Sequence, residues 1–123
     1  MVGRTEHDEQ KALIWWFDNH FKALKGRLAA VPNGGERNKI VAAKLRAEGV
    51  RKGFPDLVLL TPRHGYHGLI IEMKREKGGT VSKEQQDWID WLNIQGYRAV
   101  VCRGFEEGRS VIKEYLAAEA KAV

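Results

Sequence analysis

Apolar side chains recur along the first third of the chain with the spacing of amphipathic helices. From about Glu6 to Lys25 they return every three or four residues, which predicts a helix that ends at Gly26. A short apolar piece, Leu28 to Val31, leads into a Pro-Asn-Gly-Gly loop, and a second helix is predicted from roughly Glu36 to Glu48. We therefore expect two helices before the first strand.

The middle of the chain has the pattern of a β-hairpin. Leu57 to Leu60 and Leu69 to Met73 are runs of large apolar residues that are too short for helices. They are apolar on both faces, as in strands that are buried between two layers. The segment between them, Thr61 to Gly68, has the composition of a turn, so we expect the two strands to pair antiparallel.

The remaining third predicts a helix, a strand and a last helix. Ser82 is expected to cap the first of these helices, which ends at Gly96. Its buried side is expected to carry Trp88, Ile89, Trp91 and Leu92. A strand follows at Tyr97 to Cys102, and a helix runs from about Phe105 to Ala120. The predicted order is αα-ββ-α-β-α, an α/β fold in which helices flank a mixed β-sheet.

Composition indicates one soluble domain with a basic surface. The 123 residues suffice for a single core, so we expect one domain over residues 1–123. No apolar run reaches the roughly 18 residues of a membrane span, and Met1 to Asp8 lacks a signal-peptide pattern, which favours the cytoplasm. The only cysteine, Cys102, is predicted to be a buried strand thiol. A net charge of +5 favours a nucleic-acid partner.

The predicted hairpin brings two acids and an amine together. With the turn centred near His64, antiparallel pairing sets Asp56 across from Glu72. Side chains alternate along a strand, so Glu72 and Lys74 emerge on one face while Met73 points to the other. Unpaired charges at the end of a buried sheet are costly unless they bind a metal ion or each other. The pattern therefore predicts a metal site at this end of the sheet.

A divalent cation is the ligand that suits these side chains. Mg²⁺ prefers carboxylate oxygens together with waters and phosphate oxygens, and Asp56 and Glu72 supply the carboxylates. Such an ion stabilises charge at phosphorus and activates a bound water, while Lys74 orients that water or offsets the same charge. The predicted chemistry is phosphodiester hydrolysis. The alternative, a surface Glu-Lys pair beside an unrelated turn, is disfavoured by the position of the pair at the end of an apolar strand.

Several short motifs resemble those of one nuclease family. Gly53 to Leu57, followed by Ile71 to Lys74, resembles the PD-(D/E)XK signature of restriction enzymes and junction resolvases. The closer resemblance is to the VRR-NUC branch, which occurs in phage and bacterial stand-alone proteins and at the end of a eukaryotic repair nuclease. It extends over most of the chain and includes Glu6 to Gln10, Pro32 to Gly35 and Ser82 to Gln85.

The resemblance implies a restriction-endonuclease-like core and a structure-selective DNA endonuclease that requires Mg²⁺ or Mn²⁺. Stand-alone members act as dimers on branched DNA such as four-way (Holliday) junctions, so a homodimer in a bacterial or phage-infected cell is implied. The candidate catalytic residues are Asp56, Glu72, Lys74, Gln85, Glu6 and Glu9. Metal ligands are expected at Asp56, Glu72, Met73 and Glu6.

Three of the candidate residues also have a purely structural interpretation. Glu6 and Glu9 continue the core-facing side of the first helix, and we expect one of them, preferably Glu6, at the metal centre. Acids in a first turn are also favoured by the helix dipole alone. Gln85 stands three residues after Ser82, as in a capping box, while the family has an equivalent Gln beside the lysine. Both interpretations of Gln85 remain open at this stage.

Basic residues cluster in and after the predicted second helix. The expected DNA contacts are Asn33, Arg37, Lys39, Lys44, Arg51 and Lys52, with Arg46 in the same cluster. The alternatives are a solvated helix face for the basic residues and a plain turn for Asn33. His64 and His67 make a poor zinc site because no Cys or further His is near them. The four tryptophans are expected in the core or in dimer contacts.

Two rival functions share the predicted fold. The first is a basic DNA-binding module that does not cut, which the presence of Asp56, Glu72 and Lys74 disfavours. The second is a sequence-specific restriction enzyme, which uses the same chemistry. A chain of about one domain has no extra segment to read base edges, so we rank this function lower.

Overall fold

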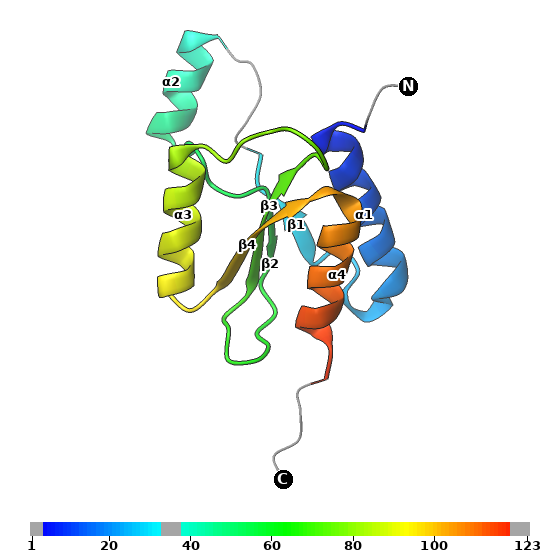
Figure 1. The fold of residues 1–123 in the computed structure, drawn as a ribbon. Coiled ribbons are helices and arrows are strands. Elements are labelled where there is room, and N and C mark those ends of the chain that lie inside the picture. The colour runs from blue at the N-terminus through cyan, green and yellow to red at the C-terminus, as the bar shows by residue number, and fades with distance from the viewer. Residues whose placement is uncertain (1–3, 33–37, 119–123) are drawn as a thin grey trace.

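The computed structural model describes residues 4–32 and 38–118, which form a β-sheet with helices on both faces (Figure 1). The elements in chain order are α1 (Glu6–His20), the 3-10 helix η1 (Lys22–Leu24), β1 (Leu28–Ala30), α2 (Lys39–Ala47), β2 (Leu57–Leu59), β3 (Leu69–Lys74), α3 (Lys83–Ile94), β4 (Arg98–Arg103) and α4 (Gly104–Leu116). None of the helices within these ranges is both long and apolar enough to cross a bilayer.

The four strands lie in the order β1-β2-β3-β4. The first three pair antiparallel, and β4 runs parallel to β3. This mixed sheet with flanking helices confirms the predicted α/β class. The predicted order lacked β1, in which Leu28 pairs with Leu59, so the observed order is α-β-α-ββ-α-β-α. Only Leu28 of this short edge strand is buried, which explains why its alternation was too brief to recognise.

The two faces of the sheet carry separate apolar cores. Helices α1 and α4 lie together on one face, and α2 and α3 lie on the other (Figure 1). The core under α1 and α4 includes Leu13, Phe17, Ile71, Met73 and Ile112. The smaller core under α3 consists of Ile70, Ile89, Leu92 and Ala99. Neighbouring residues of β3 therefore alternate between the two cores, so Met73 faces away from Glu72 and Lys74 as predicted.

The hairpin has the predicted turn. Leu57 pairs with Ile71, and the strands reverse at His64 and Gly65, whose φ angles are 52° and 82°. Positive φ at two successive central residues is typical of the tight turns that match the twist of paired strands. Strand β2 ends at Leu59, and Leu60, which was predicted to be buried in it, is 67% exposed. Leu60, the apolar residue directly after the strand, thus lies outside the core.

The helices differ in detail from the prediction. Helix α1 ends at His20, and the 3-10 turn η1 replaces its predicted last turn. Helix α2 begins at Lys39, after the Asn38 cap, and α4 ends at Leu116, short of the expected Ala120. In α3, Ser82 caps the helix as predicted, but Trp91 is 51% exposed and does not belong to the buried side. Trp91 stands two residues after the buried Ile89, more than half a turn around the helix, so it faces outward and contacts Trp88 edge to face.

Cys102 is fully buried in β4, as predicted. Burial, together with the nearby negative charge of Glu107, raises the pKa of its thiol to about 12. Because the thiolate is the reactive form of cysteine, this side chain acts as an inert part of the core.

Candidate active site

The strand register brings Asp56 to the end of β3. In the register that pairs Leu57 with Ile71, the preceding Asp56 stands opposite Glu72, and their carboxyl groups interact, as the sequence predicted. The Asp56 carboxylate accepts a hydrogen bond of 2.7 Å from the main-chain N–H of Met73. Its own carbonyl accepts one of 2.8 Å from the N–H of Val31. Asp56 is therefore held from both sides, with its carboxylate beside Glu72.

Glu72 is buried without full compensation of its charge. Its side chain is 3% exposed, and among the described residues its Oε1 atom has no hydrogen-bond partner. Burial first, and then contact with the Asp56 carboxyl, raises the pKa of Glu72 to about 8, although Lys74 acts in the opposite direction. A buried carboxylate oxygen without a partner, next to a second carboxylate, is an arrangement that a divalent cation satisfies.

Lys74 and Gln85 form one hydrogen-bonded group with Glu72. The Lys74 Nζ atom donates to Gln85 Oε1 at 2.9 Å and lies 3.6 Å from Glu72 Oε2. The side-chain amide of Gln85 donates to the same Glu72 oxygen at 3.3 Å. The Gln85 Oε1 atom also accepts from the N–H of Ser82, and Gln85 N–H donates to Ser82 Oγ, which completes a capping box. Gln85 thus has both the capping contacts and the contact with the lysine that its sequence position suggested.

Gly53 lets the segment before Asp56 lie against the first turn of α3. Its φ angle is +85°, and a Cβ atom at this position would lie 2.6 Å from the main-chain carbon of Glu84. Only glycine fits such an approach. The contact sets the distance between the Asp56 strand and the helix that carries Gln85. The sequence signal for it was the glycine of the G-x-P-D motif.

Replacing Gly53 with Ala is expected to lower the free energy of unfolding by about 3 kcal/mol. Alanine disfavours the positive φ of this position, and its Cβ atom would displace α3. Gly26→Ala is the matched control, because Gly26 has a φ of +81° but a Cβ atom there would meet no other atom within 4 Å. It is expected to lose only about 1 kcal/mol. Urea denaturation of both variants measures the difference, and equal losses would contradict the close approach at Gly53.

The two candidate acids of α1, Glu6 and Glu9, have different surroundings. The Glu6 carboxylate is about half exposed and lies 4.0 Å from Lys74 Nζ. Glu9 is buried, where it accepts a hydrogen bond from the N–H of Phe105 and forms an ion pair of 3.4 Å with Arg4. Glu9 therefore holds the start of α4, and the structure does not bring it to the cluster around Lys74. Glu6 is the helix-borne acid at the site.

The carboxylates at the site do not form a three-acid cage. In the described ranges, no three or more His, Cys, Asp and Glu side chains are grouped closely enough to hold a metal ion. Glu6 contacts Lys74 instead of joining Asp56 and Glu72. The side chain of Met73 lies in the core under α1 and α4, so only its main chain faces the site. Two carboxylates are nevertheless a usual protein contribution to Mg²⁺, with waters and substrate oxygens as the other ligands.

The expected DNA contacts are exposed where they are described. Lys39 and Lys44 lie on α2, a helix with no buried residue, and Arg51 and Lys52 precede Gly53. Lys52 forms an exposed ion pair of 3.3 Å with Glu84 in the first turn of α3. The other two expected contacts, Asn33 and Arg37, lie outside the described residues. This basic group therefore flanks the α3 side of the candidate site.

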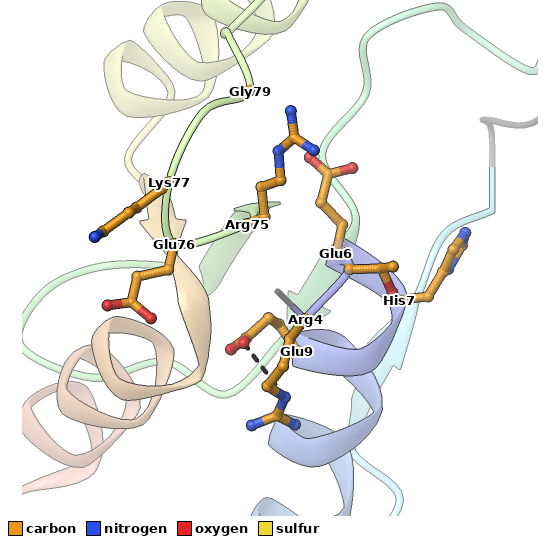
Figure 2. Close-up of a pocket in the computed structure, with 9 residues that line it drawn as sticks. Arg4, Glu6, His7, Glu9, Arg75, Glu76, Lys77 and Gly79 are labelled. Carbon is orange, nitrogen blue, oxygen red and sulfur yellow. Dashed lines mark ion pairs between the residues drawn. The ribbon is translucent and has the colours of Figure 1, made fainter. Parts of the chain in front are cut away.

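A polar cleft lies on the other side of the site, between the first turn of α1 and the segment after β3 (Figure 2). It has a volume of about 690 Å³. The cleft is lined by Arg4, Thr5, Glu6, His7, Glu9, Arg75, Glu76, Lys77 and Gly79. Sequence reasoning missed its basic residues, although Arg75 directly follows the E-x-K motif.

The fold and the two motifs at one end of its sheet define a restriction-endonuclease-like core. Residues 4–106 match the VRR-NUC domain profile, and the chain belongs to this family. It is thus a nuclease-type domain. A solved structure of a VRR-NUC domain protein is 33% identical, with a TM-score of 0.83 over 94% of this chain and 91% of that one.

A second solved structure, of a VRR-NUC domain, shares 20% identity. Its TM-score is 0.57 over 91% of this chain and 99% of that one, which supports the fold alone. No curated protein matches this chain.

Proposed function

We propose that this chain is an endonuclease that hydrolyses phosphodiester bonds of branched DNA, such as four-way junctions, with Mg²⁺ or Mn²⁺. The observation that carries the proposal is the buried pair of Asp56 and Glu72 beside Lys74, in which one carboxylate oxygen of Glu72 lacks a partner among the described residues. Membership of a nuclease family and the net charge of +5 support DNA as the substrate.

Asp56 and Glu72 would hold the cation, and the main-chain carbonyl of Met73 would be a further ligand from the same segment. Bound there, the cation supplies Lewis-acid stabilisation of the charge that develops on the phosphate and lowers the pKa of a bound water. The hydrogen bond from Met73 N–H fixes the Asp56 carboxylate, which reduces the reorganisation that binding requires.

Lys74 is the residue proposed to act on the attacking water or on the charged phosphate. Its side chain is 8% exposed and its amine is held by Gln85 Oε1, so the position of the amine is defined before substrate binds. Gln85 acts as a positioning residue because it contacts both Lys74 and Glu72. The Glu6 carboxylate, 4.0 Å from Lys74 Nζ, partly offsets the positive charge of the amine from the side that faces solvent.

Cleavage of three labelled DNA forms tests this function. Junction, flap and linear duplex DNA are incubated with Mg²⁺, with Mn²⁺ and with a chelator. We expect the junction to be cut with either metal and left intact with the chelator. Binding of all three forms without cleavage would instead establish a non-cleaving module, and discrete bands from plasmid DNA would establish a restriction-type enzyme.

A homodimer is the proposed assembly, because paired cuts across a junction require two sites. Large apolar side chains on the surface support a partner surface, and they include Trp15, Ile40, Trp91 and Ile94. Ile40 is 82% exposed on α2. The native mass from sedimentation velocity at micromolar concentration measures this directly, and a monomer mass both with and without junction DNA would rule the dimer out.

A further inference from the structure

Arg75 brings a positive charge to the edge of the candidate site. It follows Lys74, the last residue of β3, and its side chain lines the polar cleft described above. Figure 2 shows its guanidinium extended across the cleft toward the Glu6 carboxylate on α1. No hydrogen bond or ion pair within the described ranges holds this group, so it is available to a ligand that enters the cleft.

Arg75 packs against a loop that contains two glycines. Gly78 and Gly79 have φ angles of +75° and +69°, and a Cβ atom at Gly78 would lie 3.1 Å from the Nη2 atom of Arg75. The side chain therefore lies close against the main chain of the loop between β3 and α3. A side chain at Gly78 would press on the Arg75 guanidinium, whereas a Cβ atom at Gly79 would only be in ordinary contact with Arg75, 3.8 Å from its Cγ atom. Glycine at position 78 therefore suits the observed placement of Arg75.

Arg103 holds the same loop from the neighbouring strand. It pairs with Lys74 in the register of β3 and β4, and its Nη1 atom donates to the carbonyls of Gly78 and Gly79 at 3.0 and 3.1 Å. The loop begins after Lys74 and leads to the Ser82 cap of α3. Arg103 therefore fixes the wall of the cleft relative to the candidate catalytic residues.

The acids of the cleft are largely committed to other groups. Glu9 is bound by Arg4 and by the N–H of Phe105, and Glu6 lies within 4.0 Å of Lys74. The third acid, Glu76, points away from the Arg75 guanidinium (Figure 2). Within the described part of the chain, no ion pair holds Arg75, although its guanidinium faces the Glu6 carboxylate, so an anion that enters the cleft meets an available donor.

We propose that this cleft binds a backbone phosphate of the substrate strand, adjacent to the phosphate that is cut, with Arg75 as its donor. The inference rests on the proposed function, because it takes the Lys74 cluster as the point of cleavage. Arginine suits this role because its fork of N–H donors matches two phosphate oxygens. The strand would then cross the end of the sheet from the basic group near α2, on one side, to Arg75, on the other.

Neutral linkages test the contact from the DNA side. Binding of junction DNA is measured in Ca²⁺, as a non-cleaving substitute for Mg²⁺, with single methylphosphonates placed at each linkage in turn. At one linkage beside the cut, we expect the parent chain to lose about tenfold in affinity, the size of one charge-assisted contact. Arg75→Gln should bind unmodified DNA about tenfold more weakly and show no further loss at that linkage.

Two further variants separate this contact from a general loss of charge. Arg75→Lys should recover part of the affinity, and Lys22→Gln, in η1 beyond the far end of α1, should retain the sensitivity of the parent chain to the neutral linkage. The slope of log affinity against log salt should decrease by about 1 for Arg75→Gln. Circular dichroism establishes that each variant is folded.

The outcomes distinguish this inference from the proposed function. If Arg75→Gln remains as sensitive as the parent to every neutral linkage, the phosphate contact is wrong, whether or not the chain cuts DNA. If the sensitivity disappears in the variant but the parent never cleaves with Mg²⁺ or Mn²⁺, the phosphate contact stands and the endonuclease assignment fails. Absence of DNA binding by the parent chain overturns both.

Discussion

Asp56→Asn is expected to reduce metal-dependent cleavage of junction DNA by at least about a thousandfold while the protein stays folded. The asparagine side chain retains an oxygen that can accept the hydrogen bond from Met73 N–H, so the local geometry is preserved. What it removes is the negative charge that would bind the cation. Single-turnover cleavage rates in Mg²⁺, measured with thermal melting of the same samples, separate chemistry from folding.

Lys74→Met is expected to cause a similar loss for a different reason. Methionine can occupy the buried path of the lysine but supplies no charge beside Glu72, so the attacking water and the phosphate lose their cationic partner. Lys113→Met is the matched control, because Lys113 is exposed on α4, away from this cluster. Parent-like cleavage by either site variant would show that the cluster around Lys74 is not where the bond is broken.

The metal-free protein is expected to become less stable as pH rises from about 4.5 to 8. Folding raises the pKa of Glu72 from 4.5 to about 8, so the folded state holds this proton more tightly than the unfolded state. The contribution is fully present below pH 4.5, and it is lost as pH rises through the folded pKa. Melting temperatures in a chelator across this range measure it.

Two comparisons identify Glu72 as the source of this pH dependence. Glu72→Gln lacks the titrating group, so the difference between parent and variant isolates its contribution from that of all other groups. Mn²⁺ should stabilise the parent more at pH 8 than at pH 5, because it binds the ionised carboxylates. A parent and variant with the same pH dependence, or a response to Mn²⁺ that does not depend on pH, would contradict the buried state of Glu72.

The hairpin and the placement of its acids followed from the sequence because both depend on local rules. Once the turn is centred near His64, register and alternation alone fix which face Glu72, Met73 and Lys74 occupy. The structure agrees on each of these points. The Ser82 cap was equally local, since a capping box is a contact between residues three apart.

The features that the sequence did not reveal are tertiary contacts. Arg103 reaches Gly78 and Gly79 from another strand, and Glu9 binds the start of α4, far along the chain. Neither contact has a periodic or motif signature. The strand β1 was missed for a related reason, because its pairing with β2, more than its own three residues, makes it a strand. Trp91 shows that an aromatic residue in an amphipathic helix need not belong to its apolar side.

The buried thiol of Cys102 gives the protein a practical property. It is the only cysteine in the sequence, and its pKa of about 12 leaves almost no thiolate at neutral pH. A cysteine introduced on the surface, for example by Lys113→Cys, would therefore be the one position that reacts with a maleimide dye. Fluorescence measurements on junction DNA could then use the otherwise native chain, without first replacing Cys102.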